Sequence, residues 1–163
     1  MAKTTFTAEQ IETMFQIVNI DRERFRAALI EIGPVKADDP VERERWNSCY
    51  KERGVVTYGF CHRVTEALHR LNKIPGGFEP RRAPFPPASS HYFLLRIGAK
   101  AGFDGRYSPE DVIDLTADQF VDGCDYGGSE GVSFPNRSLV AARIDFTRDT
   151  GLIARRGRLQ AVG

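Results

Sequence analysis

Apolar residues recur at a helical period through the first third of the chain. The first such segment follows Thr7–Gln10, whose Thr and Gln have the spacing of a capping box at a helix start. A second segment follows Asp21 and ends at Gly33-Pro34, and a third begins at Asp39-Pro40, where proline suits the first helical position. We therefore expect residues 1–56 to form three N-terminal helices.

A fourth helical pattern covers residues 57–72 and begins with a turn at Tyr58-Gly59. Its apolar residues lie on one face at the helical period: Phe60, Val64, Ala67, Leu68 and Leu71. Cys61 then falls in the first turn, where unpaired backbone N–H groups and the positive end of the helix dipole favour a thiolate. Cys61 is therefore the candidate nucleophile. Cys49 is a weaker candidate, because it falls late in its helix, where the dipole disfavours a thiolate.

Residues 75–90 contain five prolines, which remove backbone donors and fix φ. We expect this segment to be an extended surface loop without strand pairing, because neither a helix nor a central strand tolerates that composition. Long irregular loops in small domains are commonly lids or binding loops. The segment is thus a candidate for gating a substrate or binding a protein partner, and a plain connector is the alternative.

Two strands are predicted after this loop, and each carries a residue that could assist a cysteine. Residues 89–97 place His91 near a strand start, and residues 111–115 place Asp114 inside the next strand. If the two strands pair, His91 and Asp114 can lie side by side beneath the helix of Cys61, as base and orienting acid. The alternative is structural, because a lone cysteine is commonly a small buried hydrophobe and a lone histidine a hydrogen-bonded core residue.

The remaining sequence predicts a loop at 123–131, a strand or short helix at 138–146 and a final strand at 152–154. The whole chain of 163 residues suits one domain. We expect an α+β domain over residues 1–163, with the nucleophile helix packed on a small, mostly antiparallel sheet built from residues 91–163.

Composition narrows the functional classes. The chain has 41% apolar residues, 28% charged residues and a net charge of +1, which is the composition of an ordinary globular protein. Nucleic-acid binding is not predicted, because no segment combines a basic run with interleaved aromatic residues. No apolar run approaches the roughly 18 residues of a membrane span, and the N-terminus lacks the apolar core of a secretory signal, so we expect a cytoplasmic protein. Three widely spaced cysteines argue against a disulfide framework. His62 and His69 are too far apart on one helix to share an ion, so no metal or cofactor is expected.

Three short motifs resemble the pattern of the bacterial YunG-like proteins. They are the segment 59–67 around Cys61, the triplet Ser90-His91-Tyr92 and the segment 113–120, which begins Ile-Asp-Leu-Thr. That pattern is in turn similar to the papain-like superfamily, including transglutaminase-like and NlpC-type enzymes. The resemblance implies a papain-like fold with Cys61, His91 and Asp114 as a catalytic triad. Phe60 stands where the family pattern has glutamine, so an oxyanion role of that glutamine is not carried over.

The expected function is cysteine-dependent acyl transfer, by hydrolysis, deamidation or transamidation of an amide or isopeptide bond. Cys61 would attack the carbonyl, His91 would move the proton, and Asp114 would fix the imidazole tautomer. The Cys61 N–H would stabilise the oxyanion, with Tyr58 as candidate second donor, and Trp46 would pack in the core or wall the cleft. The substrate could be a peptide, a protein or a small amide. The alternative is a non-catalytic binding or inhibitor protein of papain-like shape, which Phe60 and the proline-rich segment would both fit.

Overall fold

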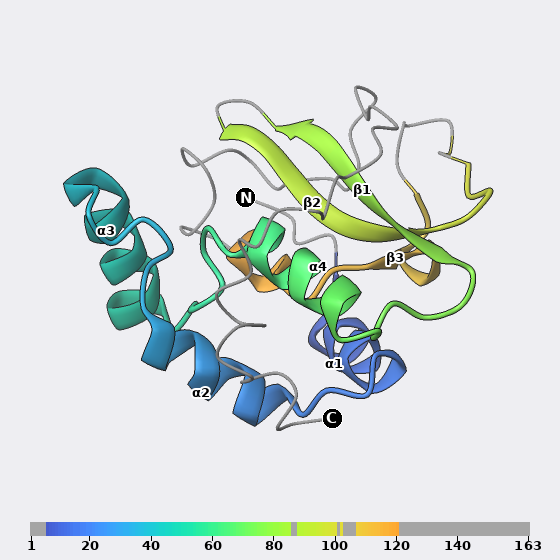
Figure 1. Cartoon of the computed structure of the whole chain (residues 1–163), viewed down its shortest axis with the longest axis horizontal. Coiled ribbons are helices and arrows are strands. Elements are labelled where there is room, and N and C mark those ends of the chain that lie inside the picture. Colours follow the sequence, from blue (N-terminus) through green and yellow to red (C-terminus); the bar gives the residue numbers. More distant parts are fainter. Residues whose placement is uncertain (1–5, 86–87, 101, 103–106, 121–163) are drawn as a thin grey trace.

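The computed structural model describes residues 6–85, 88–100, 102 and 107–120 (Figure 1). The predicted loop at 123–131 and the predicted elements at 138–146 and 152–154 lie outside this part of the chain. Within it, the protein has an α+β architecture of four α-helices and a three-stranded antiparallel sheet.

The three N-terminal helices begin where local capping chemistry predicts. They are α1 (Ala8–Ile17), α2 (Arg22–Ile32) and α3 (Pro40–Asn47), and α3 runs on into a wider helical turn, η1 (Ser48–Glu52). Thr7 completes the capping box of α1 with Gln10. The carboxylates of Asp21 and Asp39 accept backbone N–H groups at the starts of α2 and α3. All three predicted helices are therefore confirmed.

Helix α4 (Cys61–Arg70) begins at the residue that the sequence indicates as the nucleophile. The turn before it needs a residue with positive φ, which Gly59 supplies at 78°. The inner face of α4 is buried, whereas His69 near its end is exposed. Cys61 therefore opens a helix whose apolar side is held against the core.

The sheet has the strand order β1 (Phe78–Phe85), β2 (Ala88–Arg96) and β3 (Val112–Ile113), with both pairings antiparallel. The expected pairing of the segment after residue 90 with residues 111–115 is confirmed, since Leu94 lies opposite Ile113. Strand β3 is shorter than expected, so Asp114 follows its last residue instead of lying inside it.

The prediction for the proline-rich segment was wrong. Residues 78–85 are not an unpaired loop but the edge strand β1, paired with β2 over most of its length. The N–H of Ile97 donates to the carbonyl of Gly77, and the alternation of an antiparallel ladder then directs the nitrogen of Pro80 away from β2. Pro84 coincides with the irregularity in the register between Ala83 and Phe85. Edge positions and bulges are where strands accept proline. The lid role loses its basis, while partner binding stays a prediction.

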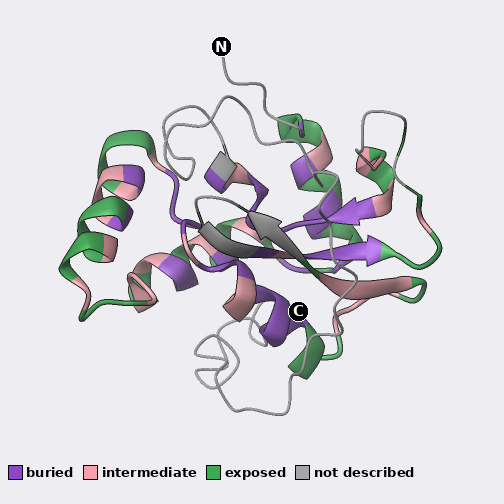
Figure 2. Cartoon of the chain, turned by 90° about the horizontal axis from the view of Figure 1, so that it is seen from above, coloured by how far each residue is buried: buried purple, intermediate pink, exposed green. Residues whose placement is uncertain are grey.

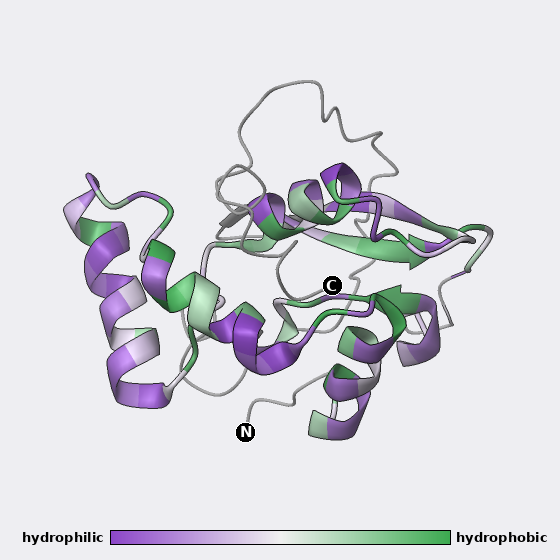
Figure 3. Cartoon of the chain, turned by 60° about the horizontal axis from the view of Figure 1, so that its bottom comes forward, coloured by the Kyte–Doolittle hydropathy of each residue, from purple (hydrophilic) through white to green (hydrophobic). Residues whose placement is uncertain are grey.

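Helix α4 packs against β2. In Figure 1, α1 and α2 lie below α4, and α3 lies to its left. Figure 2 shows burial concentrated on α4, β2 and β3, whereas the described part of β1 is mostly intermediate and much of the surface of α3 is exposed. Hydropathy follows a similar division, because β3 and the inner part of β2 are hydrophobic, whereas β1 and α3 are mostly hydrophilic (Figure 3). Among the described residues, no helix is long and apolar enough to cross a membrane.

Candidate active site

His91 and Asp114 form a buried hydrogen-bonded pair. His91 Nε2 lies 2.8 Å from Asp114 Oδ2, and the two residues are only 1% and 2% exposed. His91 comes from β2 and Asp114 follows β3, so the antiparallel pairing of these strands brings the two side chains together. The expected meeting of base and acid is therefore present in the structure.

Cys61 completes the arrangement from the helix side. Its side chain lies beside the His91 imidazole, close enough for the Cys61 charge to raise the pKa of His91. Because Nε2 is bonded to Asp114, Nδ1 is the ring nitrogen left to face the thiol. The structure thus brings together all three residues predicted as a catalytic triad, in the order thiol, imidazole, carboxylate.

The surroundings of His91 favour its protonated form. Burial alone lowers the pKa of His91, but the charges of Asp114 and Cys61 and the hydrogen bond to Asp114 raise it, to about 9. The imidazole is then mostly imidazolium at neutral pH. A protonated imidazole beside a thiol is an arrangement typical of nucleophilic cysteines.

The carboxylate of Asp114 is held by more than His91. Its Oδ1 accepts hydrogen bonds from both the backbone N–H and the hydroxyl of Thr116, each at 2.9 Å. The backbone N–H of Asp114 lies 3.3 Å from the sulfur of Met14. Sequence reasoning missed Thr116, although an aspartate that binds the backbone two residues later is a recognisable local turn signal.

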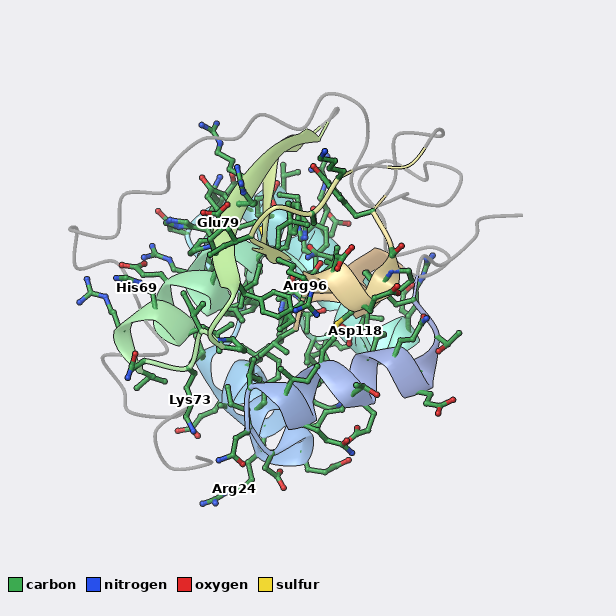
Figure 4. All side chains as sticks on the ribbon, turned by 90° about the vertical axis from the view of Figure 1, so that its right-hand side faces the viewer. Arg24, His69, Lys73, Glu79, Arg96 and Asp118 are labelled. Carbon is green, nitrogen blue, oxygen red and sulfur yellow. The ribbon has the colours of Figure 1, made fainter. Side chains whose placement is uncertain are left out.

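Two further contacts tie the segment after Asp114 to the turn before Cys61. The hydroxyl of Thr57 donates to Asp118 Oδ1 at 2.5 Å, and the N–H of Gly59 donates to Gln119 Oε1 at 3.4 Å. Asp118 and Gln119 both belong to the short helix η3 (Ala117–Phe120), on which Figure 4 labels Asp118. Burial raises the pKa of Asp118, and the Thr57 hydrogen bond partly opposes that shift. The sequence offered no local sign of these contacts, because they join residues about sixty positions apart.

The start of α4 suits an oxyanion. The N-cap residue is Phe60, whose side chain has no acceptor to offer the first-turn N–H groups. The Cys61 N–H is therefore the first donor available beside the nucleophile. Phe60 itself is fully buried in the core, so side chains at this position face inward in this fold.

The two additional residues proposed for oxyanion or substrate contacts are engaged elsewhere. The indole N–H of Trp46 donates to the carbonyl of Val56 at 3.3 Å, and its ring packs against Tyr50, so Trp46 takes the core role rather than the cleft role. The Tyr58 hydroxyl makes a hydrogen bond with Arg45 of α3. Burial raises the pKa of Tyr58 above its ordinary value. The geometry assigns both residues to the packing that supports the turn before α4.

The histidines of α4 do not assemble a metal site. The ring of His62 packs against Tyr92, with 4.6 Å between centroids, and His69 points outward from the helix (Figure 4). No group of three or more potential metal ligands occurs among the described residues.

Comparison with known proteins identified no family for this chain. No protein-family model matches the chain, and neither the curated proteins nor the solved structures contain a match. The function is therefore argued from the geometry of the site.

Proposed function

We propose that this protein is a cysteine-dependent acyl-transfer enzyme that acts on an amide or isopeptide bond. The observation that carries the proposal is a single imidazole, His91, which is hydrogen-bonded to Asp114 at 2.8 Å and interacts electrostatically with Cys61. A nucleophile, a base and a group that orients the base are the parts that such chemistry needs.

The reaction follows from these contacts. The Cys61 thiolate attacks the carbonyl carbon, forming a C–S bond, and the Cys61 N–H stabilises the oxyanion. The His91 imidazolium gives its proton to the leaving amine as the C–N bond breaks, which leaves a thioester on Cys61. Water or a second amine then attacks the thioester while His91 removes its proton, and the C–S bond breaks. Asp114 keeps the ring proton on Nε2 throughout.

The papain-like arrangement is part of the same proposal. A helix-borne cysteine packed on an antiparallel sheet, with histidine from β2 and an acid directly after β3, agrees with the resemblance of three motifs to YunG-like proteins. Peptides, proteins and small amides all present the required bond. Among the described residues, Cys49 and Cys61 form no disulfide, and a thiol nucleophile suits the reducing cytoplasm, where we propose that the protein acts.

One observation favours a second candidate, a binding protein that keeps this shape without turnover. Cys61 is only 6% exposed, whereas reactive cysteines are commonly accessible to solvent. The two candidates differ in whether an electrophile reaches the thiol and is processed with the help of His91.

An activated ester separates the two candidates. The full chain is mixed with p-nitrophenyl acetate at neutral pH, and acetylated residues are mapped by mass spectrometry while nitrophenolate release is followed. We expect a burst and an acetyl group on Cys61. His91→Gln should slow acetylation by about a hundredfold or more, because general base assistance is lost.

Cys49→Ala is the matched control, since it removes the other described thiol, and it should acetylate like the parent protein. Circular dichroism verifies that each variant is folded. Acetylation of several residues would favour the binding protein instead. So would a Cys61 acetylation rate that is the same in His91→Gln as in the parent protein.

A further inference from the structure

Gln119 connects the acid of the site to the turn that precedes the nucleophile. Its Oε1 accepts from the Gly59 N–H at 3.4 Å, and its Nε2 donates to the hydroxyl of Thr116 at 2.9 Å. That hydroxyl in turn donates to Asp114 Oδ1, also at 2.9 Å. A continuous series of hydrogen bonds therefore runs from Gly59, two residues before Cys61, to the carboxylate that binds His91.

The direction of each bond in this series is determined. The backbone N–H of Gly59 can only donate, so it requires the oxygen of the Gln119 amide. The amide nitrogen is then left to donate to Thr116, whose hydroxyl hydrogen is in turn directed at Asp114. Gln119 is 0% exposed, so no water substitutes for either partner at the surface.

We propose that Gln119 is a positioning residue for the Cys61–His91 pair, and this inference rests on the proposed acyl-transfer function. Gln119 aligns the Thr116 hydroxyl toward Asp114 Oδ1, which leaves Oδ2 for His91 Nε2. At its other end it holds the turn from which α4 and Cys61 begin. One side chain thus sets the acid and the nucleophile relative to each other.

A second hydrogen bond, besides that of Gln119 with Gly59, joins η3 to the turn before α4. The hydroxyl of Thr57 donates to Asp118, the neighbour of Gln119, from the same turn that contains Gly59. Thr57 is also buried. Because Asp118 already ties η3 to the turn, replacing Gln119 should loosen the alignment of Asp114 without separating the two segments.

The test compares Gln119→Met with Gln16→Met, an exposed glutamine of α1. Methionine keeps the length of the side chain but neither donates like an amide nor accepts strongly. The rate of Cys61 alkylation by iodoacetamide is measured across the pH range for both variants and for the parent protein. We expect the rising limb of the Gln119→Met profile to move up by about half to one pH unit, the effect of one lost hydrogen bond on the ion pair. Gln16→Met should leave the profile in place.

A double variant separates positioning from general loosening. If Gln119 acts through Asp114, Gln119→Met should shift the profile of an Asp114→Asn protein by much less than it shifts the parent. An equal shift in both backgrounds, or no shift in either, overturns the inference. Thr116→Val removes the hydroxyl between the two residues and tests the same link if Gln119→Met does not fold, with Thr116→Ser expected to restore the parent profile.

The pH profile of the parent protein tests the proposed function separately from the role of Gln119. A parent profile without a reactive plateau at low pH counts against the Cys61–His91 pair itself. A parent profile with that plateau, unchanged by Gln119→Met, counts against the role of Gln119 alone.

Discussion

Asp114 presents its two carboxylate oxygens to different partners. Oδ1 receives both donors of Thr116, and Oδ2 binds His91 Nε2. This division orients the carboxylate and leaves only acceptor atoms facing the imidazole, so the ring must carry its proton on Nε2 when it is neutral. Nδ1 is then the ring nitrogen that takes the thiol proton in the proposed reaction.

At this residue scale, Asp114→Asn should disable the pair while preserving its shape. With its oxygen held by Thr116, the asparagine amide would turn its NH₂ group toward His91 Nε2 and move the ring proton to Nδ1, facing Cys61. We expect the low-pH plateau of Cys61 alkylation to disappear and acetylation by p-nitrophenyl acetate to fall about 10² to 10⁴-fold, as in acid-to-amide changes of hydrolytic triads. Stopped-flow alkylation against pH provides the measurement.

Asp111→Asn is the matched control, because Asp111 bonds Arg96 on the surface only three positions away. Its profile should superpose on that of the parent protein, since surface ion pairs contribute little. Superposable profiles for Asp114→Asn as well would remove Asp114 from the mechanism and leave a cysteine–histidine dyad.

At the scale of elements, β1 shows how a proline-containing segment can belong to a sheet. The nitrogens of Glu79 and Arg81 point toward β2, whereas that of Pro80 points away, as the bond from Ile97 to Gly77 requires. The strand also carries an ion pair between Glu79 and Arg81. Proline therefore costs this strand no ladder bond, and it protects an edge from pairing with another chain.

This alternation predicts opposite effects at adjacent positions. Pro80→Ala should change the free energy of unfolding by less than about 0.5 kcal/mol, because no ladder bond is gained or lost. Arg81→Pro should lower it by at least about 1 kcal/mol more than Arg81→Ala does, because it removes an inward N–H from the ladder. Urea denaturation of the four proteins measures both effects. Equal stability of Arg81→Pro and Arg81→Ala would contradict the pairing of β1.

At the scale of the whole molecule, the site is also part of the core. His91 and Asp114 are almost fully buried between α4 and the sheet, and the Asp114 N–H reaches Met14 of α1. Ionisation of the site must therefore be linked to the stability of the entire fold.

Stability should fall as the pH rises above neutrality. The pKa of His91 is raised from 6.5 to about 9 in the folded protein, so the folded state holds the proton more tightly than the unfolded state. The resulting stabilisation is complete below about 6.5 and is lost as the pH passes through about 9, with an upper limit of about 3 kcal/mol. Urea denaturation at a series of pH values measures it. His91→Gln should flatten this dependence, and an unchanged slope in that variant would show that His91 is not its source.

The local features of this protein follow from residue types and their spacing alone. Thr7, Asp21 and Asp39 cap their helices through atoms two or three residues away, and Gly59 supplies the positive φ that lets α4 begin at Cys61. Such interactions need no partner from elsewhere in the chain, so residue types and spacing were sufficient to predict them. The candidate residues Cys61 and His91 were also found from local sequence, by their places near element starts, whereas Asp114 was found as an acid inside a predicted strand.

The contacts between distant groups depend on the packing of the whole fold. The proline-rich segment became β1 because β2 offers it an edge, and Trp46 lost its place beside the cleft because its N–H meets the carbonyl of Val56. Gln119 reaches Gly59 across sixty positions of chain, a contact that no spacing rule encodes. The physical reason is that pairing, burial and hydrogen-bond satisfaction between distant segments depend on the whole packed arrangement, whereas caps and turns are complete within a few residues.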